Sequence, residues 1–354
     1  MSPTPPLHPD HPPYHSEDQN RAVLEAVEVS KHFPVSRGWW RRHTLCAVDT
    51  LSLRIMPGEH IAVVGESGCG KSTLGRLLVN LLKPTQGQVY FDGQDINKLS
   101  ARDLKRLRSD VQMVFQDPHN ALNPRITAGS MLAEALRLHH RKLTKKQIDE
   151  GVAELLMRVG LNPNQSRRYP HAFSGGQRQR LCIARALSVN PRVLIADEIT
   201  SALDVSVQAQ IVNLLLDLRR NLGLAYVFIT HDLHLAEHVS QHVVVMYLGR
   251  IIESGPSRSV FAEPRHPYSQ ALIGASPHSD PKRKLQQLSL RGEPPSPIDR
   301  PQGCAFHPRC PHAEPGLCDR ITPTLSPLTE HHQVACHLIS PSLHVPPSEQ
   351  NTKF

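Results

Sequence analysis

The sequence predicts an α/β fold in which a mostly parallel sheet is covered by helices on both faces. Three β-branched, apolar runs have the length and continuity of buried strands: residues 60–64, 192–196 and 225–230. Helix-like stretches follow or separate them: residues 70–82, 175–189 and 207–222. Buried strands that alternate with helices are typical of parallel sheets, whose ligands lie at the carboxyl ends of the strands.

The composition places the chain among folded, globular proteins. Its 354 residues are 39% hydrophobic and 20% charged, which excludes a disordered chain and fits two domains or one large domain with an appendix. No apolar run approaches the roughly 18 residues of a membrane span, and we expect no cleaved secretory signal. Seven cysteines are too few for a disulfide scaffold, and the scattered net charge of +8 is weak support for a nucleic-acid or membrane partner.

Proline placement divides the chain. Six of the 31 prolines lie in residues 1–20 and 17 lie in residues 256–347, and dense proline disfavours regular elements. We therefore predict a disordered lead at 1–20, a regular body, a loop-rich region and a frayed tail at 341–354. Residues 101–173 are charged, helix-prone and poor in strand-like runs, which predicts a helical insertion within the body.

A glycine-rich segment between a predicted strand and a predicted helix indicates a phosphate-binding site. The segment reads Gly65-Glu66-Ser67-Gly68-Cys69-Gly70-Lys71-Ser72, with Thr73 next, and fits G-x-x-x-x-G-K-[ST]. Glycines let backbone N–H groups curl around phosphate oxygens, and a helix N-terminus adds partial positive charge. Lys71 can reach the β- and γ-phosphates, and the Ser72 hydroxyl can bind Mg²⁺. A purely structural glycine turn is the alternative, which the strand–loop–helix context disfavours.

An apolar strand that ends in two carboxylates, Asp197 and Glu198, supports this prediction. Asp197 at the strand end can hold the Mg²⁺ shell. Glu198 lies one residue further and can orient an attacking water as general base. Because an apolar strand followed by Asp-Glu is common, this assignment depends on the phosphate-binding segment.

Further motifs, in chain order, resemble the ATP-binding cassette (ABC) ATPases. They are Gln116 in Val-Phe-Gln-Asp-Pro, the signature Ser174-Gly175-Gly176-Gln177, the segment Ser201-Ala-Leu-Asp204, and His231 in Ile-Thr-His-Asp. The resemblance covers residues 22 to about 265. It implies a P-loop NTPase cassette with a RecA-like parallel sheet, an antiparallel β part and a helical subdomain at about 101–174. One departure is Ile199, because the family usually has proline after the catalytic glutamate.

The resemblance also implies ATP and Mg²⁺ as cofactors and gives roles to the motif residues. Phe33 would stack on adenine, Gln116 would join Ser72 and Asp197 at Mg²⁺, and His231 would contact the γ-phosphate. Lys71, Gln116, Glu198 and His231 are the expected catalytic residues. The signature of one cassette, with Asp204 beyond it, closes on ATP held by another cassette, so a single cassette implies a partner chain.

The flanking segments resemble the oligopeptide and dipeptide importer group, and most of all the second ATP-binding subunit of dipeptide permeases. They include Asn120-Ala-Leu-Asn-Pro, Arg265-His-Pro-Tyr and Arg291-Gly-Glu-Pro-Pro-Ser-Pro. The group implies ATP-driven dipeptide uptake at the cytoplasmic face of the bacterial inner membrane. It also implies a heterodimer with a paralogous ATPase, two transmembrane permease subunits and a periplasmic or lipid-anchored solute-binding protein. Two alternatives remain: a soluble ABC ATPase that acts on nucleic acid or ribosomes, or the same importer chemistry with oligopeptide, nickel or haem cargo.

Four of the seven cysteines cluster in the predicted C-terminal domain at 266–340: Cys304, Cys310, Cys318 and Cys336. Their spacing is not that of the C-x₂-C pairs of common zinc sites. Four thiolates can hold Zn²⁺ or an iron–sulfur cluster, and free thiols are the third alternative. Segments matching Gly303-Cys-Ala-Phe-His-Pro-Arg-Cys and Val334-Ala-Cys recur in the importer group, where the four positions are associated with a [4Fe–4S] cluster. The resemblance therefore implies such a cluster here.

Overall fold

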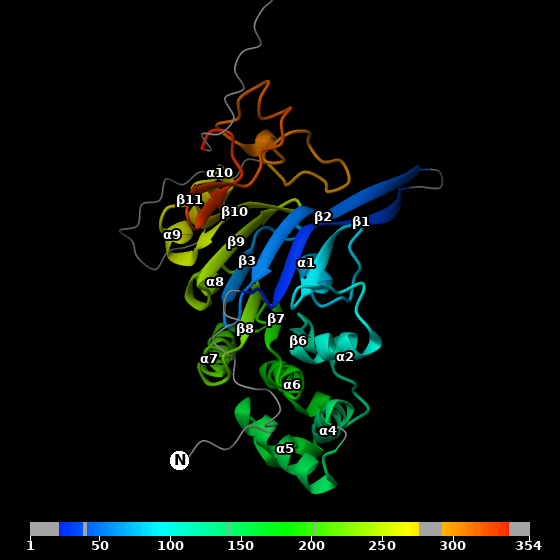
Figure 1. The fold of residues 1–354 in the computed structure, drawn as a ribbon. Helices are drawn as coiled ribbons and strands as arrows, with labels where there is room; N and C mark the ends of the chain where they lie inside the picture. The colour runs from blue at the N-terminus through cyan, green and yellow to red at the C-terminus, as the bar shows by residue number, and fades with distance from the viewer. Residues whose placement is uncertain (1–20, 38–40, 141, 202, 276–291, 340–354) are drawn as a thin grey trace, which may run out of the picture.

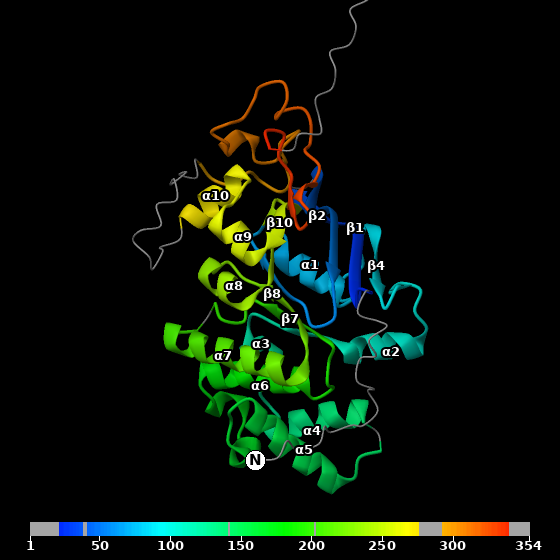
Figure 2. The ribbon, with the colours of Figure 1, turned by 60° about the vertical axis from the view of Figure 1, so that its left-hand side comes forward.

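The computed structural model describes residues 21–37, 41–140, 142–201, 203–275 and 292–339. The predicted lead at 1–20 and tail at 341–354 lie outside these ranges. The described chain forms a large central sheet, a smaller antiparallel sheet beside it, and helices packed around both (Figure 1). A mostly helical part and the C-terminal region lie at opposite ends of the molecule (Figure 2).

The central sheet has the strand order β11-β12-β10-β9-β3-β8-β7-β6. Its parallel part comprises β9 (His242–Tyr247), β3 (His60–Val64), β8 (Ala225–Ile229), β7 (Val193–Asp197) and β6 (Val111–Val114). Every residue of β3, β7 and β8 is buried, as the continuous apolar runs predict for strands covered on both faces. The predicted α/β class with a parallel core is confirmed.

Alternate residues of these strands enter different cores, because successive strand side chains point to opposite faces. Ile61, Ile195 and Ile229 pack with helix α1 (Lys71–Leu78) and the smaller sheet. Leu194 and Phe228 pack with helices on the other face. The helices of that second core are α4 (Ala128–His139), α5 (Lys145–Arg158), α6 (Gly175–Leu187) and α7 (Val205–Leu222).

The smaller sheet is antiparallel, with the order β2-β1-β4-β5. Its strands are β1 (Leu24–Arg37), β2 (Arg41–Ile55), β4 (Gln86–Phe91) and β5 (Gln94–Asp95). It shares one core with α1 and the parallel strands, so it covers the phosphate-binding side of the central sheet.

One strand lies within the range predicted to be a helical insertion. After α2 (Ala101–Asp110), strand β6 pairs with β7 at the edge of the central sheet. Four residues between charged flanks carry too short an apolar signal to be recognised as a strand. The helical part proper follows β6 and comprises α3 (Pro118–Ala121), α4, α5, and the 3₁₀ turns η1 (Pro163–Arg167) and η2 (Pro170–Ala172).

The C-terminal region continues the central sheet. Strand β10 (Arg250–Pro256) pairs antiparallel with β9, and β12 (His332–Val334) and β11 (Ser326–Thr329) add to its other side. The neighbouring helical elements are α8 (Leu233–Val239), α9 (Ser257–Ala262), α10 (Pro267–Gly274) and the 3₁₀ turn η3 (His307–Arg309). None of the helices in the described ranges is long and apolar enough to cross a membrane.

Candidate functional site

The phosphate-binding segment forms the loop between β3 and α1, as predicted. Two of its glycines, Gly65 and Gly70, are required because neighbouring backbone leaves no room for side chains. A Cβ on Gly65 would lie 2.2 Å from the Met246 carbonyl oxygen, and one on Gly70 would lie 2.0 Å from that of Ala47. Gly70 has φ 106° and caps the N-terminus of α1. The loop therefore presents backbone N–H groups at a helix start, which is the arrangement that binds phosphate.

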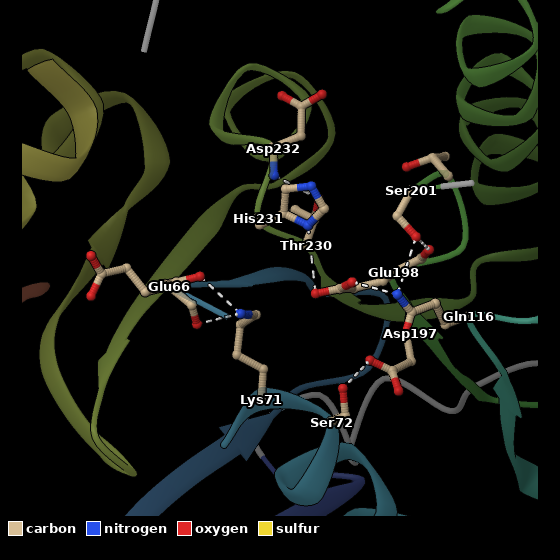
Figure 3. A network of polar contacts seen from close by, with 12 residues as sticks. Glu66, Lys71, Ser72, Gln116, Asp197, Glu198, Ser201, Thr230, His231 and Asp232 are labelled. Carbon is tan, nitrogen blue, oxygen red and sulfur yellow. Dashed lines mark hydrogen bonds and ion pairs between the residues drawn. The ribbon is translucent and has the colours of Figure 1, made fainter. Parts of the chain in front are cut away.

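Carbonyl groups of the phosphate-binding loop hold the Lys71 side chain in place. Its Nζ donates to the Gly65 oxygen at 2.8 Å and to the Glu66 oxygen at 3.0 Å (Figure 3). The Lys71 side chain is buried, with 4% of its surface exposed. A desolvated ammonium group with replaceable carbonyl partners suits an incoming phosphate.

Ser72 and Asp197 meet across the carboxyl end of the parallel sheet. The Ser72 hydroxyl donates to Asp197 Oδ1 at 2.8 Å (Figure 3). Burial raises the pKa of the Asp197 carboxyl, and the hydrogen bond from Ser72 opposes this effect. A hydroxyl and a carboxylate oxygen side by side are hard ligands that fit Mg²⁺, whose remaining ligands come from water and substrate phosphate.

Glu198 lies at the centre of a polar network just beyond β7. Its backbone has φ 46°, and its N–H donates to the Ile229 oxygen at 2.8 Å, which fixes it beside β8. Gln116 Nε2 donates to Glu198 Oε2 at 2.8 Å, and His231 Nδ1 lies 3.6 Å from Oε1. The Ser201 hydroxyl donates to the Glu198 carbonyl oxygen at 2.9 Å (Figure 3).

The structure therefore brings five predicted side chains around one space: Lys71, Ser72, Asp197, Glu198 and His231, with Gln116 alongside (Figure 3). They come from α1 and from the ends of β7, β8 and β6. Ile199, which replaces the expected proline, is buried in the core beneath the turn, with 2% of its surface exposed.

Other predicted residues are not joined to this cluster. Ser174 and Gln177 form a capping box at the start of α6, and the described residues show no hydrogen bond or ion pair from this segment to the phosphate loop. Asp204 caps α7 without a side-chain bond. Phe33 lies on β1, where Lys31 Nζ is 5.2 Å from its ring centre.

The four C-terminal cysteines are electrostatic neighbours but do not form a metal-binding group. Burial raises the pKa of the Cys304 thiol to about 11, with smaller contributions from the thiols of Cys318, Cys336 and Cys310. All seven cysteines are free. In the described ranges, no group of three or more His, Cys, Asp or Glu side chains is placed to hold a metal ion. The geometry therefore gives the iron–sulfur prediction no support.

Sequence reasoning missed the contacts that the C-terminal region makes with the phosphate loop. Arg309 donates to both Glu66 carboxylate oxygens, and the Tyr268 hydroxyl accepts from the Glu66 N–H. Arg309 lies inside the cysteine segment that the sequence singled out. However, 243 residues separate it from Glu66, and no local spacing indicates such a contact.

Two family models match the chain. One, described as ABC transporter, matches residues 48–201, and the other, described as oligopeptide/dipeptide transporter, C-terminal region, matches residues 252–318. Among solved structures, the dimeric structure of MJ0796, a bacterial ABC transporter cassette, is similar at a TM-score of 0.59 and 30% identity. That likeness covers 66% of this chain and 99% of the other.

Named relatives match nearly the whole chain. The probable peptide ABC transporter ATP-binding protein y4tS of Sinorhizobium fredii (strain NBRC 101917 / NGR234) is 48% identical over 331 residues, which cover 92% of this chain and 93% of that protein. The dipeptide transport ATP-binding protein DppF of Escherichia coli (strain K12) is 48% identical over 304 residues, covering 86% and 90%. The chain therefore belongs to the ABC transporter ATP-binding proteins that carry an oligopeptide/dipeptide transporter C-terminal region.

Proposed function

We propose that this chain is the ATP-hydrolysing subunit of a bacterial ABC importer that takes up peptides, with dipeptides as the first cargo to test. The observation that carries the proposal is the convergence of Lys71, Ser72, Asp197, Glu198 and His231 at the carboxyl ends of the parallel strands. Relatives named as dipeptide and oligopeptide transport ATP-binding proteins support the cargo class. The subunit would act peripherally, at the cytoplasmic face of the membrane.

Each residue of the site has a role that its position suits. The loop from Gly65 to Gly70 would cradle the phosphates, and Lys71 would exchange its carbonyl partners for the β- and γ-phosphates. Ser72 and Asp197 would hold Mg²⁺, which neutralises charge on the phosphates when bound.

Glu198 would take a proton from the attacking water. Gln116 already fixes one of its carboxylate oxygens, which aims the other toward His231 and the γ-phosphate position. Phe33 would stack on adenine.

The signature segment would act on a second nucleotide. Because Ser174 and Gln177 cap α6 apart from the phosphate loop of their own chain, their helix N-terminus is available to the γ-phosphate held by a partner cassette. A similar solved cassette is described as dimeric. We propose a paralogous ATPase as the partner, together with two permease subunits and a solute-binding protein.

We propose that the ATP-binding domain spans residues 22–265 and that the C-terminal domain spans residues 266–340.

We also propose that the C-terminal domain holds a [4Fe–4S] cluster. The support for the cluster is the donor set, four thiols gathered in one region. Protein purified without oxygen should contain about four iron atoms and four labile sulfides per chain. Cys310→Ser should lose them, and iron-free, folded wild-type protein would contradict the cluster.

Lys71→Ala tests the function. The variant should bind Mg·ATP about 10- to 100-fold more weakly, because charged hydrogen bonds contribute roughly 1.5–3 kcal/mol each. Lys98→Ala is the control, since that side chain is 77% exposed and pairs only with Asp95 at 3.5 Å among the ion pairs of the described residues. In liposomes carrying the whole transporter, wild-type protein should drive dipeptide uptake and Lys71→Ala should not. Equal ATP binding by all three proteins would refute the site.

A further inference from the structure

The C-terminal region contacts Glu66 of the phosphate-binding loop through two side chains, Arg309 and Tyr268. Arg309 Nη1 donates to Glu66 Oε2 at 2.8 Å, and Nη2 donates to Oε1 at 3.0 Å. The Arg309 side chain is 5% exposed and that of Glu66 is 22% exposed. A paired, two-bond guanidinium–carboxylate contact fixes direction as well as distance, so it holds Glu66 in a single orientation.

Buried aromatic rings hold Arg309 itself in place. Its guanidinium lies 5.9 Å from the ring centre of Tyr247, and Phe306, three residues earlier, packs edge-on against Tyr247 at 5.4 Å. Tyr268 contacts both rings, and its hydroxyl accepts the Glu66 N–H at 2.9 Å. Glu66 is therefore fixed at its backbone and at its side chain by parts of the chain that follow β10.

Glu66 is one of the two residues whose carbonyl oxygens hold Lys71. Its carboxylate points away from Lys71, toward the side opposite the Glu198 network (Figure 3). The carboxylate is thus placed to set the position of the loop rather than to touch phosphate. A shift of Glu66 would move the carbonyl and N–H groups beside the Lys71 ammonium.

We infer that Arg309 is a positioning residue for nucleotide binding: through Glu66 it holds the phosphate-binding loop in the form that accepts ATP. The inference rests on the proposed ATP site. It gives the C-terminal region a direct part in ATP affinity, in addition to any role of its cysteines. Arg309 touches neither nucleotide nor reacting atoms in this scheme, so its removal should act on binding more than on the chemical step.

Arg300 offers a matched control in the same region. It also ties the C-terminal region to the cassette, through an ion pair of 2.7 Å with Asp49, and it is 18% exposed. Its partners, Asp49 and Cys46 on β2 and the Leu248 carbonyl oxygen, all lie outside the phosphate loop. Arg300→Met removes the same charge from the same region. It therefore shows how affinity for ATP changes when a contact between the two regions and a positive charge are lost without a change at Glu66.

The experiment measures binding of Mg²⁺ and a non-hydrolysable ATP analogue to the full chain by isothermal titration. Arg309→Met should weaken binding about tenfold or more, Arg309→Lys should weaken it less, and Arg300→Met should stay within about twofold of wild type. In the assembled transporter, Arg309→Met should raise KM for ATP and leave kcat at saturating ATP within about twofold, whereas damage to the fold lowers kcat as well.

A double-mutant cycle shows whether Arg309 acts through Glu66. Once Glu66→Gln has removed the carboxylate, Arg309→Met should add little further loss of affinity. If the losses of affinity of the two single variants multiply in the double variant, the inference is wrong. It is also wrong if Arg309→Met binds the analogue within twofold of wild type. Lys71→Ala, measured in parallel, separates failure of the proposed ATP site from failure of the positioning role of Arg309. If the wild-type chain binds no analogue, or Lys71→Ala binds it equally, the proposed function fails and this inference fails with it.

Discussion

Replacing Glu198 with glutamine isolates the proton-accepting role proposed for this residue. Glutamine has nearly the same shape, so the turn after β7 and its N–H bond to Ile229 should persist. Its neutral amide cannot take a proton from water. Lys71, Ser72 and Asp197 keep all their contacts, because none of them bonds to the Glu198 carboxylate. Glu198→Gln should therefore bind Mg·ATP within about threefold of wild type.

The size of the loss in turnover separates a general base from a merely structural residue. Removal of a general base lowers kcat by about 10²- to 10⁴-fold, which raises the barrier by roughly 3–5 kcal/mol. The other bonds of the network are weaker. Ser201→Ala removes a neutral hydroxyl that donates to the Glu198 carbonyl at 2.9 Å and accepts from Gln116 at 3.3 Å. The 2.9 Å bond contributes about 0.5–1.5 kcal/mol and the longer bond less, so kcat should fall about 2- to 30-fold.

The assay is phosphate release by the assembled transporter at saturating Mg·ATP, with nucleotide retention measured on the same samples. Glu198→Gln should retain ATP without releasing phosphate, and Ser201→Ala should turn over slowly. If Glu198→Gln keeps more than about a tenth of the wild-type kcat, then Glu198 is not the base. If the two variants lose similar amounts, the network only supports the fold.

Two further predictions concern the stability of the fold around the site. Gly70→Ala should lower the free energy of unfolding by more than about 2 kcal/mol and abolish ATP binding, because its Cβ would lie 2.0 Å from the Ala47 carbonyl oxygen. Gly68→Ala, whose Cβ would meet no atom within 4 Å, should lower it by only about 1 kcal/mol, because of its positive φ. Urea titrations of both variants measure the difference. Burial lowers the pKa of His266 to about 4, so between pH 6.5 and 4 the unfolded chain binds a proton that the folded chain does not. Wild-type protein should therefore lose about 3 kcal/mol more than His266→Asn over that range, and parallel stability curves would contradict this assignment.

The sequence predicted the parts of the fold whose signals are local. Strand β3 has the predicted bounds, and β7 and β8 differ from prediction by one residue, because continuous apolar runs and flanking turns define them. The phosphate-binding segment was recognisable because its residues are contiguous, and backbone that passes close by requires glycine at Gly65 and Gly70. Where a signal was short, as in β6, the charged surroundings concealed it.

Contacts between distant segments could not be predicted. Nothing in the sequence indicates that Glu66 within the phosphate loop bonds to Arg309, or that β12 pairs with β10 through Glu253 and Val334. Both depend on how the proline-rich region folds back, which no periodicity records. The arrangement of the cysteines is a similar case: their clustering in the sequence predicts a shared site, but the backbone path decides how the thiols are arranged. In the described ranges no group of three or more His, Cys, Asp or Glu side chains is placed to hold a metal ion.

The ATP-binding part and the C-terminal region share one sheet and one aromatic cluster, so we expect them to unfold together. Strand β12 covers the edge of β10, and its His332 donates to the fully buried Glu253 at 2.8 Å. Removing residues after 291 would expose that edge, leave Glu253 without this partner and strip Phe306 from the rings around Tyr247. Tyr247 follows Met246, whose carbonyl oxygen lies against Gly65 of the phosphate loop, so shortening the chain would affect nucleotide binding as well as stability. An ATP-binding protein of this family that lacked the region would need other residues to hold Glu66 in place.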